Sequence, residues 1–284
     1  MVGPMLRMTL LAAALGLAPV PLHQAAAQGA APAKPDAKPE MREGCPGLIA
    51  SRSPLFQRTS LRLAALGADQ MRLTYVGHAT FLLESPQLVR IATDYNDYVR
   101  PSVLPDIVTM NHAHSTHYTN RPDPGIAHVL RGWAEDEKPA RIDLTYKDVR
   151  VRNVPTNIRT WGGTVERHGN SIFIFEIASL CIAHLGHLHG TLTQQQLDEM
   201  GRVDVVMVPV DGSYTLDLDG MIEVLHALKA PLLIPMHYFN QYSLDRFLQR
   251  MQGEWDIETL DVPSVVLSKA TLPSKPKILV LPGH

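Results

Sequence analysis

Histidine is the residue whose spacing in this 284-residue chain most clearly indicates chemistry. Six of the 13 histidines lie in two short windows, residues 112–117 and 184–189. Asn111-His-Ala-His-Ser-Thr-His117 directly follows the apolar segment Ile107–Met110, which predicts a strand that ends in a rigid loop. Imidazole binds zinc, iron and copper, and three neutral imidazoles with one open position make a catalytic zinc site. The spacing therefore predicts a metal site, with a surface histidine cluster that binds no metal as the alternative.

The surrounding pattern predicts strands first, and then helices that alternate with strands. From residue 71 the apolar segments are short, and Gly162-Gly163 and Gly169-Asn170 predict the turns of successive hairpins. Later in the chain, apolar spacing and end signals predict helices over 193–200, 218–229 and 243–252, and strands over 203–210 and 232–235. This order predicts an α/β fold of two mixed β-sheets with helices outside.

Several segments, taken in order, resemble a known family. Residues 111–117 resemble the HxHxDH signature of the metallo-β-lactamase superfamily, with His112, His114 and His117 in the histidine places. Tyr75-Val-Gly-His-Ala-Thr-Phe-Leu-Leu-Glu84 is similar to the opening strands of the branch that contains ascorbate-phosphate lactonase and the N-acylethanolamine phospholipase D-like enzymes. The strand-end aspartate and the two later histidine motifs are matched by Ile91-Ala-Thr-Asp94, Ile182-Ala-His-Leu-Gly186 and Leu233-Ile-Pro-Met-His-Tyr238. The resemblance covers about residues 70–240 and implies a four-layer αββα sandwich, which we place at 61–284.

The resemblance implies two sets of metal ligands. The implied first set is His112, His114 and His184, and the second is His117, His187 and His237. We expect one or two Zn²⁺ ions, with copper or iron as the alternative, because imidazole binds both and no ligand in these sets excludes them.

Two positions depart from the family pattern. Thr116 stands in the aspartate place of HxHxDH, and its neutral hydroxyl is a poor ligand for divalent transition metals. His187 stands in the place of the aspartate that bridges two ions, and one imidazole lone pair normally serves only one metal. The group expected to orient the attacking water is therefore missing, although zinc held by three histidines can still activate water.

The resemblance also marks residues beside the expected metal. His78 is expected to contact the substrate or to support a ligand by a hydrogen bond, and Asp94 to fix the histidine loop. Asp211 is a candidate base or hydrogen-bond partner, and Tyr238 a candidate donor to a developing oxyanion. We take His78, Asp211 and Tyr238 as candidate catalytic residues, each with a structural role as the alternative. His189 is expected to face solvent or to cap a neighbouring element.

The N-terminus has the composition of an export signal. Arg7 precedes the apolar stretch 8–20 and small residues follow at 25–27, so residues 1–27 are predicted to be a signal peptide. That stretch is short and broken by prolines, which argues against a stable membrane anchor. Residues 28–60 begin with an Ala- and Pro-rich run that predicts a tether. We therefore expect a periplasmic or secreted protein, in which Cys45 and Cys181 either form a disulfide or remain thiols.

Charge balance limits the classes of partner. The chain has 26 basic and 28 acidic residues, a net charge of −2, and no run of like charges, so nucleic acid is not favoured. We expect a small-molecule substrate. The leading hypothesis is a hydrolase that uses a metal-bound hydroxide on an ester, lactone, amide or phosphodiester bond. The alternatives are a non-hydrolytic, oxidase-like copper or iron protein and a pseudoenzyme that serves as a binding module.

Overall fold

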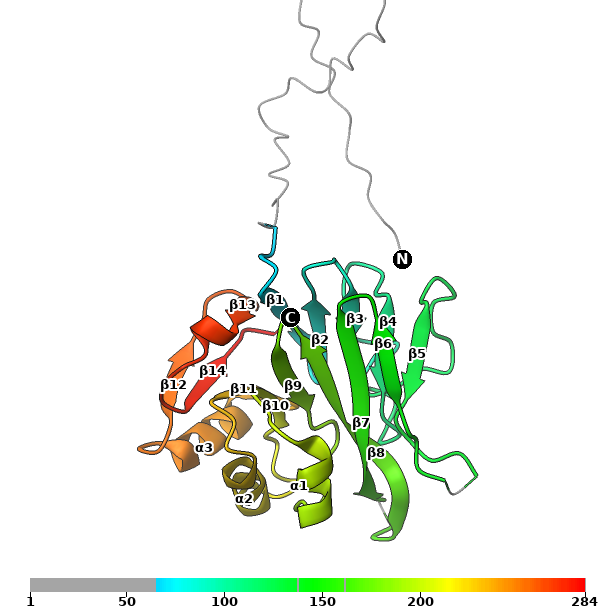
Figure 1. Ribbon diagram of the computed structural model, residues 1–284. Coiled ribbons are helices and arrows are strands. Elements are labelled where there is room, and N and C mark those ends of the chain that lie inside the picture. Colours follow the sequence, from blue (N-terminus) through cyan, green and yellow to red (C-terminus); the bar gives the residue numbers. More distant parts are fainter. Residues whose placement is uncertain (1–64, 137, 161, 284) are drawn as a thin grey trace, which may run out of the picture. The chain divides into compact units, whose positions relative to one another are not determined.

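Two stacked β-sheets organise the part of the chain that the structure describes (Figure 1). The computed structural model describes residues 65–136, 138–160 and 162–283. The predicted signal peptide, the predicted tether and Cys45 lie outside these residues. The export signal, the tether and the pairing of Cys45 with Cys181 therefore stay predictions.

The first sheet is mixed and has six strands in the order β13-β1-β2-β3-β4-β5. Strands β3, β4 and β5 run parallel to one another, while the pairs β2–β3, β1–β2 and β1–β13 are antiparallel. The strand bounds are β1 (Gln70–Gly77), β2 (Thr80–Glu84), β3 (Arg90–Ala92), β4 (Ile107–Met110), β5 (His128–Arg131) and β13 (Ser264–Ser268).

The second sheet is also mixed and has eight strands in the order β12-β14-β11-β10-β9-β8-β7-β6. Its first five strands are parallel and the rest form antiparallel hairpins. The bounds are β6 (Asp143–Tyr146), β7 (Val149–Arg159), β8 (Val165–Ile177), β9 (Leu180–His184), β10 (Val205–Pro209), β11 (Leu232–Met236), β12 (Asp256–Thr259) and β14 (Lys277–Val280).

The main core lies between the two sheets. Phe81 and Leu73 of the first sheet and Phe173 and Phe175 of the second are fully buried in one cluster. Each large apolar side chain removed from water in this way contributes about 1.5–3 kcal/mol. The expected sandwich of two mixed sheets is therefore confirmed, and it holds the ends of its strands rigidly.

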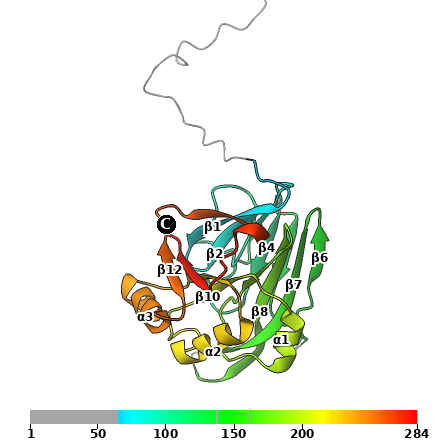
Figure 2. The same cartoon turned by 60° about the vertical axis from the view of Figure 1, so that its left-hand side comes forward.

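Three helices cover the outer face of the eight-stranded sheet: α1 (Gln194–Met200), α2 (Leu218–Leu228) and α3 (Gln241–Met251) (Figure 2). Met221, Val224 and Leu225 of α2 are buried at helical spacing, as the sequence predicts. On the outer face of the six-stranded sheet, apolar side chains such as Met110 pack against loop residues such as Trp133. Within the described ranges, no helix has both the length and the apolar character of a membrane span.

One predicted turn is wrong. Gly169 and Asn170 do not end a hairpin but lie inside β8, which pairs with β7 along most of its length. Position 169 has no room for a side chain, because a Cβ there would come within 2.7 Å of the Ile158 side chain. The turn predicted at Gly162-Gly163 does connect these two strands. Glycine marks close packing at one of these positions and a turn at the other.

Candidate metal centre

The carboxyl ends of three parallel strands bring polar side chains to one edge of the eight-stranded sheet. Strands β9, β10 and β11 are parallel neighbours, so these ends meet at the same edge. His187 follows β9, Asp211 follows β10 and His237 follows β11. From the facing sheet, His78 follows β1 and the loop 111–117 follows β4. Distant parts of the sequence thus meet, since 120 positions separate His117 from His237.

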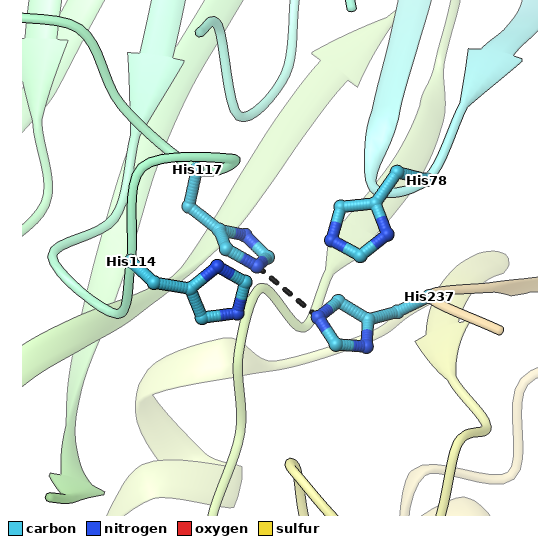
Figure 3. A group of neighbouring side chains, drawn as sticks. All are labelled: His78, His114, His117 and His237. Atoms are coloured by element: carbon cyan, nitrogen blue, oxygen red, sulfur yellow. Dashed lines mark hydrogen bonds between the residues drawn. The ribbon is translucent and has the colours of Figure 1, made fainter. Parts of the chain in front are cut away.

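Five histidines form one cluster at this edge. His78, His114, His117 and His237 present ring nitrogens that all lie within 4.8 Å of one another (Figure 3). The Nε2 atoms of His117 and His237 are 3.1 Å apart. His187 completes the cluster, because its Nε2 lies 3.1 Å from that of His114. We call these five residues the histidine cluster.

Buried carboxylates hold two members of the cluster. His117 Nδ1 lies 2.5 Å from Asp94 Oδ2, and His237 Nδ1 lies 3.0 Å from Asp211 Oδ1. All four side chains are inaccessible to solvent or nearly so. Each carboxylate accepts the Nδ1–H, which turns the ring and leaves its lone pair on Nε2.

The two carboxylates are themselves held by hydrogen bonds. Asp94 accepts from the Asn111 amide at 2.9 Å, and burial raises its pKa to about 6. Asp211 accepts from the Thr215 hydroxyl and the backbone N–H groups of Ser213 and Tyr214. Burial alone would raise the pKa of Asp211, but the hydrogen bonds to its carboxylate outweigh burial and hold the pKa well below its usual range. Asp211 therefore stays ionised behind the cluster.

Neutral groups hold two further members. His114 Nδ1 lies 2.8 Å from Thr116 Oγ1, which also lies 3.0 Å from His78 Nε2. His187 Nδ1 lies 2.7 Å from His189 Nε2. Each of these contacts has one donor and one acceptor when His114 donates to the Thr116 hydroxyl, the hydroxyl donates to His78, and His187 donates to His189. His189 then carries its proton on Nδ1, which is buried and has no partner among the described residues. In that assignment His114 and His187 also keep their lone pairs on Nε2.

Burial keeps four histidines of the cluster neutral. The pKa of His78 falls to about 3, first because the ring is buried and then because His237 and His114 lie close. The pKa values of His114, His117 and His187 are also lowered, again first by burial and then by neighbouring histidines. A neutral imidazole is the form that binds metal ions.

The donor set fits a transition-metal ion. His114 and His187 direct Nε2 lone pairs at each other, as do His117 and His237, and two acceptors 3.1 Å apart repel unless a proton or cation lies between them. Imidazole nitrogen suits zinc, copper, iron and nickel. Ligand histidines in proteins also typically donate their second ring nitrogen to a supporting group, as all four do here.

The backbone at the cluster is strained. His78, Asp94 and His237 have φ values of 51°, 42° and 53°, in the left-handed region that residues other than glycine seldom occupy. The backbone N–H of His237 donates to the His78 carbonyl at 2.8 Å, which ties two of these residues together. Such conformations cost about 1–3 kcal/mol each and persist where the surroundings enforce them, often at functional sites.

A cavity of about 300 Å³ opens beside the cluster. His114 and His187 line it from the cluster side, and His189 lies next to them. The β7–β8 hairpin supplies further lining residues, including Arg159 and Glu166. A small molecule in this cavity would therefore lie against the ring nitrogens of the cluster.

Comparison with known proteins agrees with this architecture. Residues 72–237 match the family described as the beta-lactamase superfamily domain, and this range runs from β1 to the last histidine of the cluster. The chain belongs to this superfamily. It is 28% identical over 199 residues to a metal-dependent hydrolase of Thermoplasma acidophilum, a match covering 63% of this chain and 87% of the relative. A metal-dependent hydrolase of Methanoculleus marisnigri is 25% identical over 193 residues, covering 59% of this chain and 81% of the relative.

A crystal structure also resembles this member of the metallo-β-lactamase superfamily. It is of a superfamily protein of Thermotoga maritima, for which zinc-dependent hydrolysis is proposed. The two chains share 28% identity with a TM-score of 0.55, and the match covers 75% of this chain and all of the other. The superfamily fold is thus shared at the level of both sequence and structure.

His112, the first histidine of the superfamily motif, does not join the cluster in this structure. Its Nδ1 lies 2.8 Å from Glu166 Oε1 on β8, and its ring packs near Tyr118 and Trp133. Residues 112–117 form bends and turns, and the Glu166 carboxylate and two aromatic rings hold the His112 ring away from the cluster. The implied first ligand set of His112, His114 and His184 is therefore not assembled.

His184 belongs to one of the histidine motifs of the sequence, but its ring nitrogens bond to backbone groups and not to the cluster. It is fully buried at the end of β9, where its Nε2 donates to the Ala79 carbonyl at 2.8 Å. Its Nδ1 accepts the backbone N–H of Gly186 at 3.2 Å. Both ring nitrogens are thus bonded to backbone groups that link β9 to the chain beyond β1, which gives His184 a structural role here.

The two positions that depart from the superfamily pattern both belong to the network. Thr116 is not placed as a ligand, in line with its chemistry, but joins His114 to His78 through its hydroxyl. His187 lies inside the cluster and is supported by His189, which is half-buried there and does not simply face solvent. The supporting roles of Thr116 and His189 escaped the sequence interpretation, and the only signal was their position beside other histidines.

The three candidate catalytic residues occupy different places. His78 lies in the cluster, with its ring centroid 4.2 Å from that of His237. Asp211 occupies the second of its two expected roles, as the hydrogen-bond partner of His237. Tyr238 is half-buried, and its hydroxyl interacts with that of Tyr75, which in turn donates to the His78 carbonyl. Tyr238 is thus linked to the cluster through the backbone of His78.

Proposed function

We propose that this chain is a metal-dependent hydrolase whose metal is held by His114, His117, His187 and His237. One observation carries the proposal: all four Nδ1 atoms have supporting partners, so the Nε2 lone pairs of His114 and His187 face each other, as do those of His117 and His237. Zinc is the proposed metal, and when bound it would supply Lewis acidity and generate a nucleophile from water at neutral pH.

The residues of the chain have separate tasks in this proposal. Asp94 and Asp211 hold two ligands in one tautomer, and Thr116 and His189 hold the other two. His78, neutral at pH 7, borders the ligands without being needed as one and is placed to orient a substrate or to hold a proton. The substrate is a small molecule with an ester, lactone, amide or phosphodiester bond, bound in the cavity beside His114 and His187.

The names of the relatives support hydrolysis, since the proteins of Thermoplasma acidophilum and Methanoculleus marisnigri are both described as metal-dependent hydrolases. The N-terminal sequence supports action in the periplasm or outside the cell. A copper or iron protein without hydrolytic activity is the second candidate, because the ligands proposed here are all imidazoles.

The test is metal analysis of the full chain purified from its own compartment, together with turnover of generic esters and phosphodiesters. We expect about one zinc per chain and turnover, both of which His237→Ala abolishes. His226→Ala is the matched control, because His226 lies on α2 paired with Glu254 on the protein surface. Copper or iron with visible absorption and no turnover would establish the redox alternative. Protein that binds little metal and stays inactive when zinc is added would mark a pseudoenzyme.

A further inference from the structure

The cavity beside the histidine cluster contains an arginine that the proposed function does not use. Arg159 is the last residue of β7 and lines the cavity together with His114, His187 and His189. It comes from the β7–β8 hairpin and shares this cavity with two of the proposed metal ligands, so a molecule bound there can contact both.

Other arginines of the same strand have protein partners, and Arg159 differs from them. Arg150 forms a two-pronged ion pair with Asp143, and Arg152 bonds to Glu176 at 3.0 Å. Arg159 is exposed, its backbone pairs with Val165, and within the described residues its side chain has no ion pair or hydrogen bond. A free guanidinium that lines a cavity is suited to a carboxylate or phosphate, which it binds through two parallel hydrogen bonds.

The cavity contains little negative charge that could neutralise Arg159. Glu166 lines the cavity, but its carboxylate is engaged with His112 Nδ1 at 2.8 Å. Asp211 is buried behind His237 and is saturated with hydrogen bonds.

A second cavity of about 380 Å³ continues from the first and shares Ile158, Arg159, Gly163 and His189 with it. Its wall includes the apolar side chains of Val165 and Leu188. Arg159 therefore stands where the two cavities meet, with the histidine cluster on one side and a partly apolar space on the other.

We propose that Arg159 selects organic oxyanions as substrates, holding a carboxylate or phosphate group while the remaining apolar part of the molecule extends into the second cavity. This inference rests on the proposed hydrolase function, because a bound oxyanion is a substrate only if the chain hydrolyses it. Anion binding by Arg159 itself requires no turnover. The ligand is thus an amphipathic small molecule with its negative group close to the bond that is cleaved.

Calorimetric titration of the zinc-loaded full chain tests the proposal with three probes: phenylphosphonate, phenylacetate and the neutral phenylacetamide. We expect one or both anions to bind at least about tenfold more tightly than the amide, because a charge-assisted hydrogen bond is worth about 1.5–3 kcal/mol. The two anions separate phosphate from carboxylate recognition. Arg159→Gln is expected to remove that preference, and Arg159→Lys to keep part of it.

Arg167→Gln is the matched control, since Arg167 lies on the same hairpin, is exposed and lines neither cavity. Equal losses in Arg159→Gln and Arg167→Gln would overturn the proposal, as would anion binding that Arg159→Gln leaves unchanged, because the metal alone would then hold the anion. Repeating the titration on chelated protein separates the two proposals. Arg159-dependent anion binding without any turnover would retain this site and reject the hydrolase.

Discussion

Two groups of histidines in this molecule look alike in sequence and are used differently in the structure. His112, His114 and His117 lie in one short loop, yet only His114 and His117 belong to the cluster. The same contrast separates His187 from His184 after β9. His112 also has a carboxylate at Nδ1, but this carboxylate belongs to Glu166 on β8, and the ring packs near Tyr118 and Trp133 instead of the cluster. His184 has both ring nitrogens bonded to backbone groups, so neither lone pair is available to a metal.

Removing one histidine of each group gives the largest expected difference in zinc affinity between the two groups. His117→Ala should lower zinc affinity by more than the roughly 100-fold that loss of a supporting partner costs, because a ligand itself is lost. His112→Ala, the matched control from the same loop, should change the affinity by less than about tenfold. Competition with a chromophoric chelator measures both constants. Equal losses would mean that His112 is also a zinc ligand and that the two histidines do not differ.

The next largest effect is expected from acid, which should lower the free energy of unfolding. Because the folded-state pKa of His78 is about 3 and those of its neighbours are also lowered, the unfolded chain binds more protons below about pH 6.5. The free energy of unfolding of metal-free protein should therefore be highest above pH 6.5. It should fall as the pH drops, by about 1.4 kcal/mol per pH unit for each histidine that stays neutral.

One carboxylate opposes this trend. The pKa of Asp94 is raised by burial to about 6, so its titration between its ordinary value and pH 6 adds stability as the pH falls. Since several histidines titrate against one aspartate, the net slope should keep the sign of the histidines. Urea unfolding at pH 7.5, 6.5 and 5.5 measures it, and stability that stays constant or rises toward pH 5.5 would contradict the neutral cluster.

The smallest expected effect concerns the backbone-bonded group. His184→Ala should leave the Ala79 carbonyl and the Gly186 N–H without partners, at a cost of about 1–3 kcal/mol in the free energy of unfolding. His226→Ala, an exposed ion-pair residue, should cost about 0–1 kcal/mol. Denaturant unfolding of metal-free protein compares the two. If His184→Ala instead spares stability and removes the metal, His184 is a ligand and the comparison fails.

The sequence predicts the scaffold of this site better than its contacts. Strand β4 was expected at Ile107–Met110 and lies there, because an apolar run between polar loops has few other ways to be buried. The helical spacing of Met221, Val224 and Leu225 likewise predicts the buried face of α2. Patterns of this kind report local burial, which one segment largely determines by itself.

Ring directions depend on residues that arrive from elsewhere in the chain. His112 is turned by Glu166, which lies 54 positions later, and His184 by the Ala79 carbonyl, which lies 105 positions earlier. The motif shows that histidines gather at this strand end, but the partner of each ring nitrogen follows only from the folded topology. Thr116 illustrates the same limit, since its hydroxyl could be excluded as a ligand but not assigned to His114 and His78.

The long sequence separation within the cluster also bears on when the metal can be acquired. His78 and the loop 111–117 are synthesised well before His237. The contact between the Nε2 atoms of His117 and His237 forms only once β11 has paired with β10. Contacts between such distant positions form late in folding, because closing a long loop costs entropy before the contact repays it. Metal loading should therefore follow chain completion and report that the sandwich has closed.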